Sequence, residues 1–172
     1  ERIAALEGAD LVVVDAAGCS AHVKEYAHLL ADDPEWAARA RRVAARTVDL
    51  VEVEAPDRDG PGIGPVAVHD ACHHVHAQAI TREPRAMLRA AGAEPVEWPD
   101  GTRCCGAAGL YSVLEPEMSA TLRRQKAEAI ASTGAPLVSV ANPGCAIQIA
   151  AGLREIGADI RVVHPAEAAA RR

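Results

Sequence analysis

Four cysteines in the second half of the chain have the spacing and the neighbours of metal ligands. Cys72 is followed after 31 residues (73–103) by the adjacent pair Cys104 and Cys105, and after another 39 residues (106–144) by Cys145. Adjacent cysteines can close a disulfide only through a strained ring, whereas two neighbouring thiolates can bind different irons of one cluster. The pattern therefore indicates a metal or iron–sulfur site on these four residues.

The residues beside these cysteines fit the same interpretation. Gly106 and Gly109 follow the pair and Gly144 precedes Cys145. Glycine lets backbone N–H groups come close to cluster sulfides. We also expect Cys145 near a helix N-terminus, where the helix dipole favours a thiolate.

Three other interpretations of the same residues stay open. A structural zinc site is one, because thiolates suit both metals. A thiol–disulfide protein using the vicinal pair is another, although the chain has no Cys-x-x-Cys. A buried cysteine taken alone is often an inert core residue. Histidines crowd around Cys72 and add to the zinc interpretation, but we expect them to be structural or solvent-facing, with the pair His69 and Asp70 orienting the Cys72 loop; they are His69, His73, His74 and His76.

A fold of alternating strands and helices is predicted to position the cysteines. Short apolar runs alternate with segments of helical period, which is typical of a Rossmann-like α/β protein with a parallel sheet flanked by helices. The expected strands are 10–15, 65–69, 94–98, 136–141 and 159–163, and the expected helices are 33–48, 83–92, 116–134 and 145–156. Each cysteine site then follows a strand or precedes a helix. The carboxyl ends of parallel strands share one edge of a sheet, so these loops can converge there.

An internal repeat predicts the domain organisation. The segment 11–19, LVVVDAAGC, aligns without gaps on 137–145, LVSVANPGC, so a strand, a small-residue turn and a cysteine at a helix start occur twice. The segment 54–64 is rich in Pro, Gly and Asp and has the composition of a linker. We therefore expect the C-terminal half of a first domain over 1–57, a linker over 58–64 and a complete second domain over 65–172.

Composition excludes some classes of function. The net charge is −6 and no basic run occurs, which argues against nucleic-acid binding. No apolar run reaches the roughly 20 residues that span a bilayer. The sequence starts at Glu1 without a signal-peptide pattern, and its five cysteines are an odd number that does not suit a secreted disulfide framework. We therefore expect a cytoplasmic protein, and a fragment of a longer one.

The motifs resemble a known family. The stretches HDACHHVHAQAI (69–80), RCCGAAGLYSVLEPEM (103–118) and NPGCAIQIAAGLR (142–154) are similar to the cysteine-rich CCG domain. That domain occurs twice in a subunit of heterodisulfide reductase, in lactate-utilisation iron–sulfur proteins and in the iron–sulfur subunit of glycolate oxidase. The similarity is highest to the last of these and extends over nearly the entire chain.

The resemblance implies a cofactor and a set of residues. The fullest family pattern ends in Cys-x-x-Cys, and here Asn142 stands in the first position of that pair. Four thiolates remain, enough for a conventional [4Fe–4S] cluster, with Gly106, Gly144 and Asn142 lining it. In the first copy the matching position is Ala16, and Cys19 would be an orphan ligand of that copy's site.

The resemblance also implies a role. The chain would be an electron-transfer part of a flavin-linked glycolate or D-lactate dehydrogenase, passing electrons from flavin-containing subunits toward a quinone or other acceptor. No substrate chemistry is expected on this chain alone, and it has no Gly-x-Gly-x-x-Gly dinucleotide motif. The location would be the cytoplasm, or the cytoplasmic face of the inner membrane through the complex.

Overall fold

Two parallel sheets organise the chain in the computed structural model, which describes residues 1–54, 62–99 and 101–170. The larger sheet has the order β4-β3-β5-β6 and the smaller one pairs β1 with β2, with every pairing parallel. Their bounds are β1 (Val12–Val14), β2 (Thr47–Asp49), β3 (Gly64–His69), β4 (Ala93–Val96), β5 (Leu137–Val140) and β6 (Arg161–Val163). The predicted α/β class with parallel sheets flanked by helices is confirmed.

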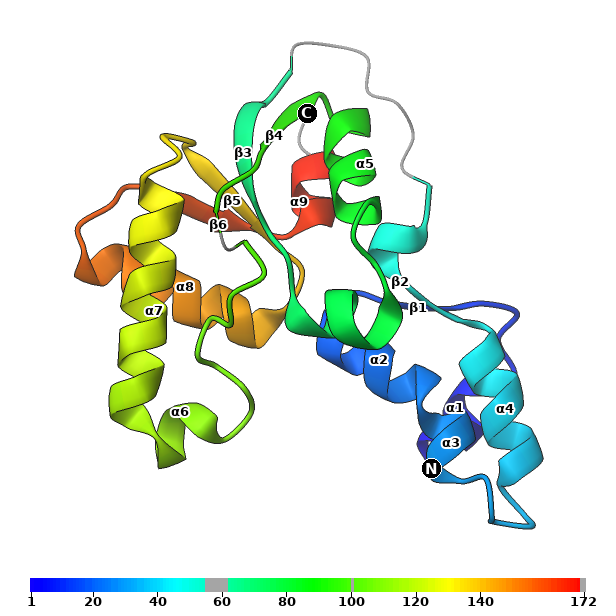
Figure 1. Ribbon diagram of the computed structural model, residues 1–172. Coiled ribbons are helices and arrows are strands. Elements are labelled where there is room, and N and C mark those ends of the chain that lie inside the picture. Colours follow the sequence, from blue (N-terminus) through cyan, green and yellow to red (C-terminus); the bar gives the residue numbers. More distant parts are fainter. Residues whose placement is uncertain (55–61, 100, 171–172) are drawn as a thin grey trace.

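Helices cover both faces of the larger sheet (Figure 1). The helices are α1 (Arg2–Leu6), α2 (Ala17–Lys24), α3 (Tyr26–Leu29), α4 (Ala37–Ala45), α5 (Glu83–Ala90), α6 (Tyr111–Leu114), α7 (Pro116–Ala131), α8 (Pro143–Glu155) and α9 (Pro165–Ala170), with a 3-10 turn η1 (Leu50–Glu52) and a π-helical turn η2 (His73–Ala77). Helices α7 and α8 pack on one face, and α5 and α9 pack on the other. None of the described helices is both long and apolar enough to span a bilayer.

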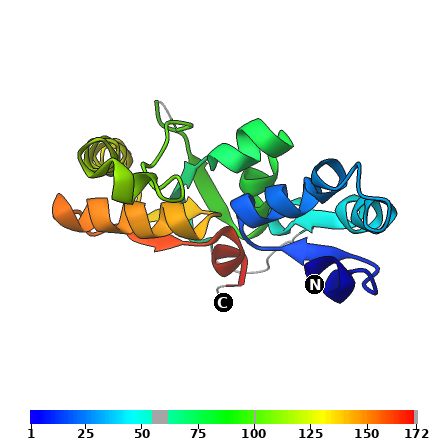
Figure 2. The ribbon, with the colours of Figure 1, turned by 90° about the horizontal axis from the view of Figure 1, so that it is seen from below.

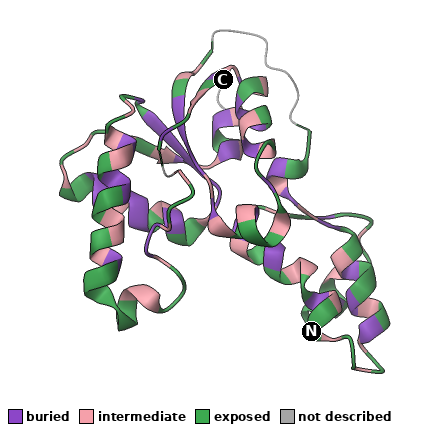
Figure 3. Cartoon of the chain, in the orientation of Figure 1, coloured by how far each residue is buried: buried purple, intermediate pink, exposed green. Residues whose placement is uncertain are grey.

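The strand sequences explain this three-layer arrangement. Strands β3 and β5 lie in the middle of the sheet, and both are rich in buried Val, as expected of parallel strands covered on both sides. Successive side chains point to opposite faces, so Val66 and Val68 join the core under α5 while Ala67 joins the core under α7 and α8. Buried residues gather in this sheet and on the inner sides of its helices (Figure 3).

All five predicted strands are confirmed, but the predicted helix over 33–48 is wrong at both ends, since α4 begins only at Ala37. Helix α4 stops at Ala45, and Thr47–Asp49 forms strand β2, which pairs with β1 through Val12 and Thr47. The β-branched Thr47 and Val48 favour an extended backbone, and the partner strand lies 35 residues away in sequence. Such a short strand gives no periodic signal of its own, so only the pairing reveals it.

Residues 1–54 form a small unit at one end of the molecule, with α7 and α8 at the other end (Figure 2). Its own core contains Ile3, Tyr26, Ala40 and Val43. Most of the predicted linker over 58–64 lies outside the described residues, and its last residue, Gly64, already belongs to β3. The division into one complete domain and half of another stays a prediction.

The two repeated segments have the same local backbone geometry. Strand β1 leads into α2 through Ala16, and β5 leads into α8 through Asn142. The two residues that precede these helices have φ, ψ of −137°, 118° for Ala16 and −142°, 123° for Asn142. Each helix begins at the next residue, so Cys19 and Cys145 both occupy the third helical position.

Candidate metal centre

The carboxyl ends of β3 and β5 form a topological switch point. Strand β3 continues through α5 to β4 on one side, and β5 continues through α8 to β6 on the other. Ligands of open α/β sheets bind in the crevice at such a point. Cys72 lies three residues after the end of β3, Cys145 lies in the first turn of α8, and the loop between β4 and α6 carries the vicinal pair Cys104 and Cys105.

The four predicted thiols come together there. Cys72 is in hydrogen-bonding contact with Cys104, and Cys105 is in hydrogen-bonding contact with Cys145. Cys105 and Cys145 are buried, Cys72 and Cys104 are half-buried, and all are free thiols. We call these four residues the four-thiol set. Cys19 is exposed on α2. Among the described residues, it does not interact with the four-thiol set.

The thiols perturb one another strongly. Burial and the nearby sulfurs of Cys104 and Cys105 raise the pKa of Cys72. The hydrogen bond from Cys145 lowers the pKa of Cys105 to about 6, and the same bond raises the pKa of Cys145. Thiolates this close repel each other unless a cation lies between them. A metal ion supplies that positive charge and holds its coordinating thiols deprotonated. The arrangement is therefore chemically suited to a metal or cluster.

A buried lysine supplies positive charge next to the set. The side chain of Lys126 on α7 is almost completely buried; its Nζ donates to the carbonyl oxygen of Gly101 at 2.8 Å and lies 4.8 Å from the ring centroid of Trp98. Burial lowers the pKa of Lys126 to about 8, while Cys105 and other thiols oppose that shift. Sequence reasoning missed this residue because a single lysine on a long helix has the pattern of a solvated position.

His69, the last residue of β3, faces the same thiols. One of its ring nitrogens and the sulfurs of Cys105 and Cys145 lie within 4.8 Å of one another. Neither ring nitrogen has a hydrogen-bond partner among the described residues, and the residue is 3% exposed. Burial, followed by the charge of Lys126, lowers the pKa of His69 to about 3. The imidazole is thus neutral and unpartnered, and one of its ring nitrogens can donate a lone pair to a metal at the site.

Asp70 does not work as a pair with His69. Its carboxylate accepts two hydrogen bonds from Arg85 on α5, at 2.7 and 2.9 Å, and Arg85 also binds Glu97. These carboxylates raise the pKa of Arg85. Asp70 therefore fixes the loop before Cys72 to α5, while His69 points toward the thiols.

Gly106 holds the Cys-Cys-Gly loop against the helices. Its φ of +84° is a conformation that L side chains rarely adopt, and a Cβ atom there would lie 2.7 Å from the carbonyl oxygen of Ser119. Its N–H donates to the sulfur of Cys104 at 3.4 Å, and its carbonyl accepts from the Ser119 hydroxyl at 2.8 Å. Gly144 has no such restriction, because a Cβ atom there would meet nothing closer than 3.6 Å.

Asn142 connects the two repeated segments. Its amide nitrogen donates to the sulfur of Cys145 at 3.5 Å, and its amide oxygen accepts from the N–H of Gly18 at 3.2 Å. Beside it, the N–H of Ala17 donates to the carbonyl of Ala141 at 3.0 Å. The N-terminal turn of α2 is thus attached directly to the turn that carries Cys145.

The other three histidines around Cys72 are solvent-facing or structural, as expected, and one of them contacts a buried carboxylate. His73 and His76 are exposed, whereas His74 is buried, with its Nε2 3.0 Å from the Oδ2 of Asp49. Asp49 also accepts from the Ser20 hydroxyl at 2.5 Å. Burial raises the pKa of Asp49, but the hydrogen bonds from His74 and Ser20 outweigh it, so the net shift is downward. This buried network joins residues 1–54 to the loop after Cys72.

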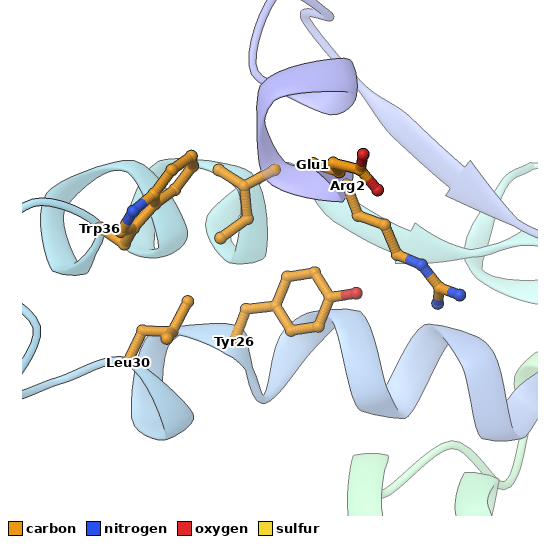
Figure 4. A pocket seen from close by; sticks show the side chains of 6 residues that line it. Glu1, Arg2, Tyr26, Leu30 and Trp36 are labelled. Atoms are coloured by element: carbon orange, nitrogen blue, oxygen red, sulfur yellow. The ribbon is translucent and has the colours of Figure 1, made fainter.

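A pocket in the first unit lies apart from the thiols. Tyr26, Leu30 and Trp36 line it with their side chains, together with Glu1 and Arg2 (Figure 4). Its described lining carries neither cysteine nor histidine. This pocket therefore offers no thiol or imidazole ligand for a metal in its described lining.

Comparison with known proteins agrees with this location. The profile of the cysteine-rich CCG domain matches residues 66–150, a range that contains the four-thiol set. The chain is 38% identical over 178 residues to a probable glycolate oxidase iron-sulfur subunit of Bacillus subtilis (strain 168), covering 97% of this chain and 40% of that protein. It is 31% identical over 173 residues to lactate utilization protein A of Bacillus thuringiensis (strain Al Hakam), covering 96% of this chain and 72% of that protein.

The chain belongs to the cysteine-rich CCG family. Lactate utilization protein A 1 of Bacillus cereus (strain Q1) is related to the same extent, with 31% identity over 173 residues. The chain spans less than half of the Bacillus subtilis relative and about three quarters of the lactate utilization proteins. The four-thiol set lies within the region that matches the CCG family, and the fold brings these cysteines together at the carboxyl edge of the larger sheet.

Proposed function

We propose that this chain is the iron–sulfur electron-transfer part of a system that oxidises a 2-hydroxy acid such as glycolate or D-lactate. The four-thiol set would hold a [4Fe–4S] cluster. The observation that carries the proposal is the convergence of four cysteines, from three separate loops, at the switch point of a parallel sheet. The names of the relatives, an iron-sulfur subunit and lactate utilization proteins, supply the class of reaction.

The chemistry of the site fits such a group. Thiolates are the usual protein ligands of iron–sulfur clusters, and here a buried lysine and an unpartnered imidazole lie close to them. A bound cluster supplies reversible one-electron transfer. The chain's own residues would hold it: Gly106 shapes the loop of the vicinal cysteines, Asn142 donates to the sulfur of Cys145, and Lys126 offsets negative charge.

The proposed partner is a flavin-containing dehydrogenase subunit, with a quinone or other acceptor downstream. Several large apolar side chains are exposed just before and on α6 and near the N-terminal ends of α7 and α8; they are Leu110, Val113, Leu114, Met118 and Ile147. Exposed apolar patches commonly mark contact surfaces. Electron transfer requires the partner to approach the rim of the cluster site, so we propose that the flavin subunit docks here. The proposed location is the cytoplasm or the cytoplasmic membrane face, where thiols stay reduced.

The test is a metal analysis of the chain purified without oxygen. We expect about four irons and a matching amount of acid-labile sulfide per chain, with an electron paramagnetic resonance signal after dithionite reduction. Cys104→Ser should lose the signal, and Cys19→Ser, at an exposed position outside the set, should keep it. Iron and sulfide absent from anaerobically prepared wild-type protein would refute the proposal.

A structural zinc site is the second candidate. The observation that favours it is the compact trio of His69, Cys105 and Cys145, whose donor atoms lie within 4.8 Å of one another. Structural zinc takes four such nitrogen and sulfur ligands. One zinc and no iron in the same analysis would select this function and make the chain a scaffold for its partners.

A further inference from the structure

The imidazole of His69 is a buried polar group at the metal centre that has no hydrogen-bond partner among the described residues. The side chain is 3% exposed, and both of its ring nitrogens lack a partner among the residues that the structure describes. Buried polar groups in native proteins nearly always have a partner, so each exception needs an explanation. A bound metal is the explanation that the surroundings of His69 favour.

The position of His69 directs it at the thiols. It is the last residue of β3 and pairs in register with Val140 of β5, so it lies at the switch point itself. A ring nitrogen and the sulfurs of Cys105 and Cys145 are mutually within 4.8 Å. The backbone of a central strand holds the side chain in place, and residues on rigid strands make precise ligands.

The other buried histidine shows what a structural imidazole looks like in this fold. His74 is as deeply buried, and its Nε2 also lacks a well-aligned hydrogen bond, but that atom lies 3.0 Å from the carboxylate of Asp49, within ion-pair distance. His69 has no equivalent carboxylate, since neighbouring Asp70 is bound by Arg85. Lys126, whose charge acts on His69, is a donor and cannot accept a hydrogen bond from it. The imidazole therefore presents a free lone pair to the thiol side.

We propose that His69 is a nitrogen ligand of the metal centre and takes one of the four ligand positions of the cluster in place of one thiol of the four-thiol set, so that the centre has mixed imidazole and thiolate ligation. This proposal rests on the proposed iron–sulfur function for the identity of the metal, although its geometry holds for any thiophilic cation. An imidazole ligand is neutral where a thiolate is negative. Replacement of thiolate by imidazole raises the reduction potential of an iron–sulfur centre.

The experiment is pulsed electron paramagnetic resonance on the reduced, anaerobically prepared wild-type chain, with natural and with ¹⁵N-labelled histidine. We expect the hyperfine coupling of a directly bound nitrogen, and its isotope shift in the labelled protein. His69→Gln should abolish this coupling, and His73→Gln, at an exposed neighbouring position, should leave it unchanged. A cluster signal without a directly bound nitrogen in the wild-type chain overturns the proposal, even if the His69 variant fails to fold.

The outcome is separable from that of the proposed function. If the wild-type chain holds zinc in place of iron, the iron–sulfur function fails, and Co²⁺ exchanged for the zinc then serves as the probe. A cobalt absorption spectrum that changes in His69→Gln and not in His73→Gln supports His69 as a ligand. A spectrum that is the same in all three proteins overturns it, and a chain that binds neither iron, zinc nor cobalt overturns both proposals.

Discussion

The N-terminal turns of α2 and α8 have the same local structure and opposite surroundings. Both follow a short parallel strand, both begin after a residue in nearly the same extended conformation, and both carry a cysteine at the third helical position. Cys19 on α2 is exposed, whereas Cys145 on α8 is buried against Cys105 and Asn142. A strand–turn–helix motif therefore places a thiol, but loops from neighbouring strands make it part of a site.

Replacing the two equivalent cysteines tests this comparison most directly. We expect Cys145→Ser to abolish iron incorporation, because it removes a central member of the four-thiol set. Cys19→Ser should leave the iron content of the chain unchanged, since that thiol is exposed and outside the set. Iron analysis after anaerobic reconstitution measures both, and equal losses in the two variants would contradict the distinction.

Two glycines next to the ligands give the second contrast. Gly106→Ala should lower the free energy of unfolding by about 3 kcal/mol, because it combines a left-handed backbone conformation with a backbone clash at 2.7 Å. Gly144→Ala should change it by no more than about 0.5 kcal/mol, since the added methyl group meets nothing closer than 3.6 Å. Urea unfolding of the metal-free variants measures both. A neutral Gly106→Ala would show that the loop is not held as described.

The third test concerns the buried contact between the two units, in which Asp49 meets His74. Asp49→Asn should lower the free energy of unfolding by about 2 kcal/mol at neutral pH, because it weakens the hydrogen bonds with Ser20 and His74. The pKa of Asp49 is lowered from 3.8 in the folded state. Its carboxylate therefore contributes stability that is complete above about pH 3.8 and is lost as the pH falls through the lowered value.

Unfolding measured from neutral to acidic pH checks this expectation. The variant should lack the part of the acid-induced loss that the wild-type carboxylate causes. Asp32→Asn, which changes an exposed acid, is the control and should follow the wild-type curve. Parallel curves for Asp49→Asn and the wild-type protein would contradict the assignment.

The smallest expected effect concerns the positive charge of Lys126, which is a further difference between the surroundings of Cys145 and those of Cys19. Lys126→Met should favour the oxidised cluster about tenfold, a decrease of about 59 mV in a one-electron potential, because a nearby cation stabilises the more negative reduced state. Lys126→Arg keeps the charge and should shift the potential less. A redox titration followed by electron paramagnetic resonance decides, and an unchanged potential in Lys126→Met would show that its charge is screened from the cluster.

The sequence predicted the elements whose signal is local. The five strands and the helices opened by Pro84 and Pro116 are where apolar runs and helix-start residues indicated them, whereas α8 begins at Pro143, two residues before its predicted start. The strand β2 escaped, because three residues carry no periodicity and the strand exists only by pairing with β1. The candidate site residues that the sequence predicted are those whose residue type indicates a particular chemistry, such as the vicinal cysteines and the glycine that follows them.

The sequence by itself determined the kind of protein: a parallel α/β fold with cysteines at the ends of its strands, because strand period and thiol chemistry are properties of short segments. Only the tertiary structure decided which other groups share the site. His69 and Lys126 come from β3 and α7, and Asp49 meets His74 across the two units. Their roles depend on burial and on partners far away in sequence, and a side chain acquires those only when the sheet and its helices have packed.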